Sequence, residues 1–151
     1  MIERKQRDEY AQLLRNFLSG KLTNFEYEEQ FESIDFESDD AINQIYCDVW
    51  YSYCDLNEHK LDEKGRGFET REQRLVIERF ILFLHSNNEY EWPINSIKES
   101  LIRFLTFGKK GLSEEKKLKN LKGNREVWPF FTEVEYKYAL SNPRLLNETH
   151  T

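Results

Sequence analysis

Residues 70–86 read TREQRLVIERFILFLHS, and this stretch decides the fold. Its apolar positions, Leu75 to Leu84, fall on nearly every side of a helical projection rather than on one stripe. A helix that is apolar all round is normally buried by several neighbouring helices. Thr70 offers a capping hydroxyl at the start, and Asn87-Asn88 follows the end. The sequence therefore predicts a central apolar helix over about 70–86.

The segments before this helix show one-sided periodicity. From about Arg4 to Leu18, apolar residues recur three and four positions apart, which is typical of a helix with one buried face. Thr23 with Glu26 forms a capping-box sequence and predicts the start of a second helix. Ser38-Asp39-Asp40 is a third start signal, and the spacing after it predicts a helix to about Glu58. The expected apolar sides comprise Tyr10, Leu13, Leu14, Phe17 and Leu18; Phe25, Tyr27, Phe31 and Ile34; and Ile42, Ile45, Val49, Tyr53 and Leu56.

The rest of the chain continues the helical pattern. Segment 96–107 is amphipathic, segment 113–122 is short and mostly polar, and Thr132 precedes a last expected helix over 133–140. The chain has only 6 glycines and 3 prolines. No segment alternates apolar and polar residues for long enough to demand a sheet. We expect an all-α fold: a single domain over 1–151, with six or seven helices around the central one.

Composition excludes several classes of protein. The 151 residues include 11 Phe, 8 Tyr and 3 Trp, a content that disordered chains lack. The longest apolar run, Phe80 to Leu84, falls far short of the roughly 18 residues that a membrane span requires. The charged start, Met1 to Asp8, lacks a signal-peptide apolar segment, and 2 cysteines are too few for a disulfide framework. The sequence predicts a cytoplasmic protein with reduced thiols and no membrane association.

Charge is distributed very unevenly along the chain. The net charge is −6, yet residues 23–63 hold thirteen acidic residues and one basic residue, Lys60. Residues 103–125 hold eight basic residues against two acidic ones. Such asymmetry produces a field that attracts partners of opposite charge.

The acidic block suggests a non-enzymatic interaction module that binds a basic protein through the 23–63 face. An immunity-protein or antitoxin-like inhibitor fits the size and acidity. The candidate partner-binding residues are Glu28, Glu29, Glu32, Asp35, Glu37, Asp39 and Asp40. The simpler interpretation is a solvated helix face, because runs of charge usually serve solubility.

Two other interpretations use the basic segment. The acidic block could meet Lys109–Lys122 of a second copy, which would make the protein a homo-oligomeric scaffold. Contact with nucleic acid is the other. The overall acidity argues against it, and so does the lack of aromatic residues between Gly108 and Val127 that could stack on bases.

An enzymatic or metal-binding alternative rests on Asp48, Asp55 and His59. In a helix that runs to Glu58, Asp55 and His59 stand at i and i+4, and Asp48 lies two turns earlier on the same side. Carboxylates and an imidazole on one face can ligate a metal or form an acid–base pair. The sequence contains no nucleotide-binding glycine loop, nucleophile-elbow or zinc-protease motif, so no cofactor is expected.

Two runs carry a resemblance. Val49-Trp50-Tyr51-Ser52-Tyr53-Cys54-Asp55, with His59 after it, is the first. Arg79 to Leu84, with Ser86 and Glu89-Tyr90-Glu91-Trp92-Pro93, is the second. Together they are similar to a pattern in small uncharacterised bacterial all-α proteins, over about the first 95 residues. Cys54 stands where those proteins often carry an acid. The resemblance implies a bacterial cytoplasmic origin and no particular activity.

Overall fold

The computed structural model describes residues 2–34, 39–53, 56–61, 71–93 and 123–142. Within these residues the secondary structure is helical and contains no strand, which confirms the all-α class. The α-helices are α1 (Arg4–Leu18), α2 (Asn24–Glu32), α3 (Asp40–Trp50), α4 (Arg71–His85) and α7 (Glu133–Leu140), and a 3-10 turn, η1, spans Arg125–Val127. The helices expected over 96–107 and 113–122 lie outside the described residues.

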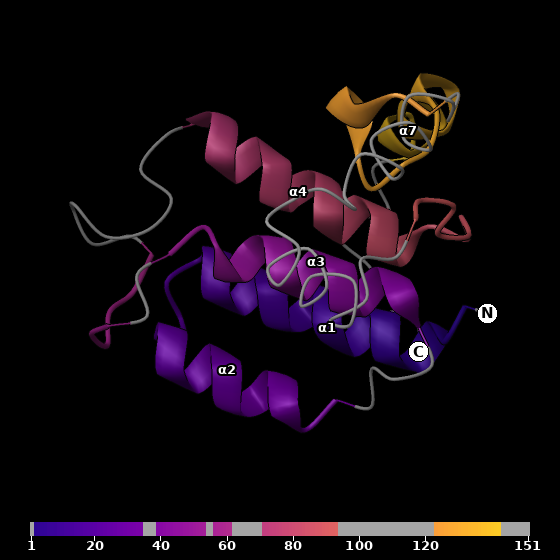
Figure 1. Ribbon diagram of the computed structural model, residues 1–151. Coiled ribbons are helices and arrows are strands. Elements are labelled where there is room, and N and C mark those ends of the chain that lie inside the picture. The colour runs from indigo at the N-terminus through magenta and orange to yellow at the C-terminus, as the bar shows by residue number, and fades with distance from the viewer. Residues whose placement is uncertain (1, 35–38, 54–55, 62–70, 94–122, 143–151) are drawn as a thin grey trace, which may run out of the picture.

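The helices stack in layers, with α1 and α3 between α4 on one side and α2 on the other (Figure 1). Helix α1 packs on both α2 and α4, while α4 also contacts α3 and α7. The expected stripe of α1 is confirmed, because Tyr10, Leu13, Leu14 and Phe17 are all buried. The core therefore runs through the layers rather than around a single helix.

Helix α4 is buried over only part of its length. Its C-terminal half, Ile77 and Phe80 to His85, is buried on nearly every side, as a helix with several neighbours should be. Its N-terminal half differs, because the side chain of Leu75 is 50% exposed. Burial on nearly every side is thus limited to the C-terminal half, and the prediction of a central apolar helix over about 70–86 is not confirmed.

Helix α3 is shorter than the sequence predicts. It ends at Trp50 instead of Glu58, and the Ser52 amide donates to the Val49 carbonyl in the turn that follows. Aromatic residues and serine from Trp50 to Tyr53 have only middling helix propensity. The turn is stabilised by packing, since the ring of Tyr53 meets the edges of Phe17 and Tyr27. Tertiary contacts therefore outweigh the apolar spacing that suggested a longer helix.

A buried ion pair joins the start of α1 to the start of α3. Arg7 and Asp39 are 1% and 2% exposed, with Arg7 Nε 2.6 Å from Asp39 Oδ2 and Arg7 Nη2 3.1 Å from Asp39 Oδ1. The Asp39 carboxylate also accepts the amides of Ala41 and Glu3, and Asp39 is the N-cap of α3, within the predicted start signal Ser38-Asp39-Asp40. Arg7 Nη1 donates to the Asn88 carbonyl beyond α4, at 2.8 Å. One arginine thus connects three segments.

Arg4, one turn before Arg7, holds the end of α4. Its guanidinium donates to the carbonyls of Leu84, His85 and Ser86, which an α-helix leaves without internal partners. It also lies 3.2 Å from the Asp8 carboxylate. The same oxygen of Asp8, Oδ1, lies 3.2 Å from Nδ1 of the buried His85.

The C-terminal elements are attached to α4 through polar contacts. Arg79 Nε donates to the Trp128 carbonyl at 2.6 Å, and Arg79 Nη1 donates to the Glu126 carbonyl at 2.8 Å. The indole of Trp92, which is buried, donates to the Phe130 carbonyl. Helix α7 begins with a capping box from Thr132, which the sequence placed correctly.

Substitution of Arg7 by methionine should lower the free energy of unfolding by about 3–5 kcal/mol, because it leaves the Asp39 carboxylate buried and unpaired. The double variant Arg7→Met/Asp39→Asn should recover part of that loss, since it removes both charges. Lys5→Met breaks the exposed Lys5–Glu9 pair and should cost less than about 1 kcal/mol. Urea unfolding measures all three. Equal losses from the single Arg7 variant and the double variant would contradict the role of the ion pair.

Stability should also depend on His85. Burial, reinforced by the charge of Arg15, lowers the pKa of His85 to about 4. The unfolded chain, with a histidine pKa of about 6.5, therefore binds more protons between these values. The contribution of His85 is fully present above about pH 6.5 and is lost as the pH falls to about 4, by up to about 1.4 kcal/mol for each pH unit. Thermal unfolding of wild type and His85→Gln across this window measures it. Identical pH slopes would contradict the prediction.

Candidate partner-binding surface

One face of helix α2 is buried, so the opposite face points to solvent. Tyr27, Phe31 and Ile34 follow a helical spacing of four and three and are all buried. The ring of Phe31 stacks on Tyr46 of α3, with centroids 3.7 Å apart. The Tyr27 hydroxyl lies 2.9 Å from that of Tyr10 on α1. These contacts hold α2 firmly against α1 and α3.

The opposite face of α2 carries the predicted glutamates. Glu29 and Glu32 are exposed and Glu28 is half-buried. Phe25 precedes them by four, seven and three residues, so these four side chains share one side of the helix. We call Glu28, Glu29 and Glu32 the α2 acidic face.

The glutamates of the α2 acidic face differ in their pairing from several other acids of the described structure. Among the described residues, four acids outside α2 form salt bridges with Lys or Arg: Asp8 with Arg4, Glu9 with Lys5, Asp39 with Arg7 and Glu133 with Lys137. Across the residues that the structure describes, no salt bridge involves a glutamate of α2. The negative charge of this helix is therefore left uncompensated within that part of the chain.

Tyrosines beneath this surface respond to its charge. The Tyr53 hydroxyl donates to Glu28 Oε1 at 2.7 Å, which fixes the position of this carboxylate. Burial is the largest cause that raises the pKa of Tyr53, and this hydrogen bond adds to it. Burial also raises the pKa of Tyr46, and the charges of Glu28 and Glu32 raise it further. The negative charge of the α2 acidic face thus contributes to the raised pKa of Tyr46 on α3 and of Tyr53, which follows α3.

The other predicted partner-binding residues fare differently. Asp40 is exposed in the first turn of α3. The prediction that Asp39 contacts a partner is wrong, because its carboxylate is buried against Arg7 and is not available to a partner. Its ion pair with the buried guanidinium of Arg7 explains why this acid points inward. Asp35 and Glu37 lie outside the described residues.

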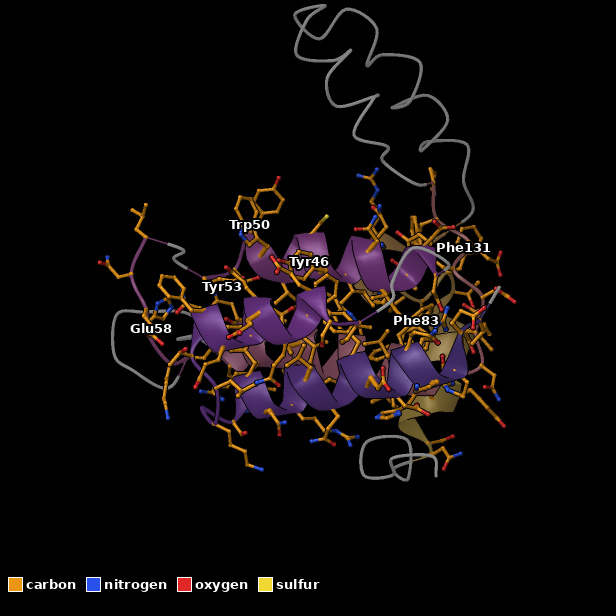
Figure 2. All side chains as sticks on the ribbon, turned by 90° about the horizontal axis from the view of Figure 1, so that it is seen from below. Tyr46, Trp50, Tyr53, Glu58, Phe83 and Phe131 are labelled. Atoms are coloured by element: carbon orange, nitrogen blue, oxygen red, sulfur yellow. The ribbon has the colours of Figure 1, made fainter. Side chains whose placement is uncertain are left out.

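A short segment, 56–61, is tied to the first turn of α2. The Asn24 side chain donates to the Asn57 carbonyl at 3.2 Å and accepts the His59 amide at 2.8 Å. The Thr23 hydroxyl donates to Glu58 Oε1 at 2.9 Å. Trp50, Tyr53 and Glu58 lie toward one end of the molecule, and Phe83 and Phe131 lie toward the other (Figure 2).

For two exposed apolar residues at this end, the position predicted from the sequence was wrong. Phe25 was expected on the buried side of α2 and is 44% exposed, while Leu56 was expected on α3 and is 83% exposed. The sequence did hold a signal for Phe25, because it stands two residues before Tyr27. Two residues correspond to about half a helical turn, so the two rings must point to nearly opposite sides.

The acid and imidazole alternative does not assemble as predicted. Because α3 ends at Trp50, His59 is not on that helix, and Asp48 remains on it alone. His59 is buried, with Nδ1 2.8 Å from the Asn57 carbonyl, and its Nε2 has no hydrogen-bond partner among the described residues. Asp55 lies outside those residues. Within them, no three His, Cys, Asp or Glu side chains gather closely enough to hold a metal ion.

Comparisons with family models, curated proteins and solved structures give no match to this chain. None of the described helices has both the length and the apolar content needed to cross a bilayer.

Substitution of Asn24 by alanine should release segment 56–61 from α2. The His59 amide would lose its acceptor, so its hydrogen exchange should accelerate, and the free energy of unfolding should fall by about 2 kcal/mol. Asn43→Ala, at an exposed position of α3, is the matched control and should change neither quantity appreciably. Continued protection of the His59 amide in Asn24→Ala would show that other contacts hold the segment.

Proposed function

We propose that this protein is a non-enzymatic interaction module that binds a basic protein partner through the α2 acidic face. The carrying observation is the uncompensated charge of α2. The described acids of α1, the acid that caps α3 and one acid of α7 pair with cations, whereas Glu28, Glu29 and Glu32 do not.

The arrangement of these carboxylates supports recognition rather than solvation alone. Glu28 is held in place by Tyr53, and the helix beneath it is fixed by the stacked rings of Phe31 and Tyr46. A rigid row of like charges creates a directed field, which raises the association rate with a surface of opposite sign. It also repels partners of like charge.

An immunity-protein or antitoxin-like inhibitor is the form of this function that the protein's size and acidity favour. Such an inhibitor would cover the basic working surface of another protein and needs no reaction of its own. The homo-oligomeric alternative would instead pair the α2 acidic face with the Lys109–Lys122 segment of a second copy. That segment lies outside the described residues. Sedimentation at low salt separates the two possibilities, because only the oligomer has twice the 18.3 kDa mass.

Reversal of two exposed glutamates, Glu29→Lys/Glu32→Lys, should weaken partner binding and its dependence on salt. The control Glu72→Lys/Glu78→Lys makes the same change in net charge at exposed positions of α4. Wild type and both variants are immobilised, exposed to source-cell lysate at low salt and eluted with a salt gradient. We expect wild type and control to retain the same basic protein, and the α2 variant to bind it about tenfold more slowly.

Three results would overturn this proposal. The first is equal retention by the α2 variant, once circular dichroism has confirmed that it is folded. The second is equal weakening by the control, which would point to net charge rather than to α2. The third is the absence of any protein held by wild type at low salt.

A further inference from the structure

Phe25 and Leu56 emerge from adjoining parts of the molecule. Phe25 lies in the first turn of α2, and Leu56 immediately precedes the residues that Asn24 and Thr23 bind. Their side chains are 44% and 83% exposed. Residues 23 and 24 thus bring together two segments that are distant in sequence, each of which carries an exposed apolar side chain.

The surroundings of these two residues are acidic. Glu29 is one helical turn from Phe25, Glu26 is adjacent to it, and Glu58 is two residues from Leu56. Glu26 and Glu58 are both held by Thr23, since Glu26 accepts its amide and Glu58 accepts its hydroxyl. Apolar side chains with charged residues around them have the arrangement of a protein interface, where a dry centre is enclosed by a polar rim.

We propose that Phe25 and Leu56 are the apolar anchor of the partner-binding surface, with Glu26, Glu29 and Glu58 as its rim. The occupant is a protein surface that offers an apolar hollow bordered by Lys or Arg side chains. This inference rests on the proposed function and adds an apolar contact to it. The basic border of the partner would complement the charge of the glutamates. The apolar hollow would accommodate the two exposed apolar side chains.

The backbone around the anchor is already ordered, which favours binding. The capping box of Thr23 fixes the start of α2, and the two hydrogen bonds of the Asn24 side chain fix the segment that follows Leu56. A partner therefore has little chain entropy to remove when it covers these side chains.

The test uses two synthetic arginine-rich peptides of equal length and charge. One carries leucines between its arginines, and the other carries serines at the same positions. Isothermal titration calorimetry at low and high salt should show that wild type binds the leucine peptide about tenfold more tightly, as burial of one large apolar side chain allows. Phe25→Ser/Leu56→Ser should remove this preference and keep the salt dependence of binding.

Val134→Ser is the matched control, because Val134 is 77% exposed on α7. It should keep the full preference for the leucine peptide. Circular dichroism confirms that each variant is folded.

The possible outcomes separate this inference from the proposed function. A preference that survives Phe25→Ser/Leu56→Ser, or that Val134→Ser removes equally, overturns the anchor alone. Salt-dependent binding of both peptides must still weaken in Glu29→Lys/Glu32→Lys if the proposed function holds. No binding of either peptide overturns both. A wild-type dimer that Phe25→Ser/Leu56→Ser dissociates would assign the surface to a second copy and overturn the inference.

Discussion

The buried ion pair between Arg7 and Asp39 is the contact on which the arrangement of the helices depends. It sets where α3 begins, how α1 lies against it and where the chain runs after α4, because Arg7 also binds the Asn88 carbonyl. A paired charge in the core adds little net stability, but it strongly disfavours any arrangement that separates its members. The Cζ atom of Arg7 also lies over the ring of Phe83, 5.2 Å from the ring centroid, which further restricts the position of the guanidinium.

The surface proposed to bind a partner follows from this interior. Asp39 is drawn inward by Arg7, and Tyr27 and Phe31 of α2 are drawn inward by the rings of α1 and α3. The remaining side of α2 then carries glutamates that have no cation beside them in the described structure. This side of α2 stays acidic because the arginines of the core bind other groups.

The sequence predicted correctly those structural features that depend on residues close together in the chain. The capping box at Thr23, the capping role of Thr132 and the apolar stripe of α1 were all predicted correctly, since each depends on residues within a few positions. The end of α3 was not, because it depends on Tyr53 meeting Phe17 and Tyr27 across the fold. Of the candidate site, the glutamates of α2 were foreseen, but the inward turn of Asp39 and the exposure of Leu56 depend on distant partners.

The positions of Arg4 and Arg7 also bear on how the chain folds as it is synthesised. Both arginines leave the ribosome about eighty residues before the carbonyls of residues 84–88 that they bind. Until then, α1 can pair with α2, through the rings of Tyr10, Phe17, Tyr27 and Phe31, and with the start of α3, through Arg7 and Asp39. The remaining side of α1 must wait for α4, and closing so long a loop is an entropic barrier. While it is being synthesised, the chain therefore passes through a stage in which the side of α1 that packs on α4 is exposed to solvent.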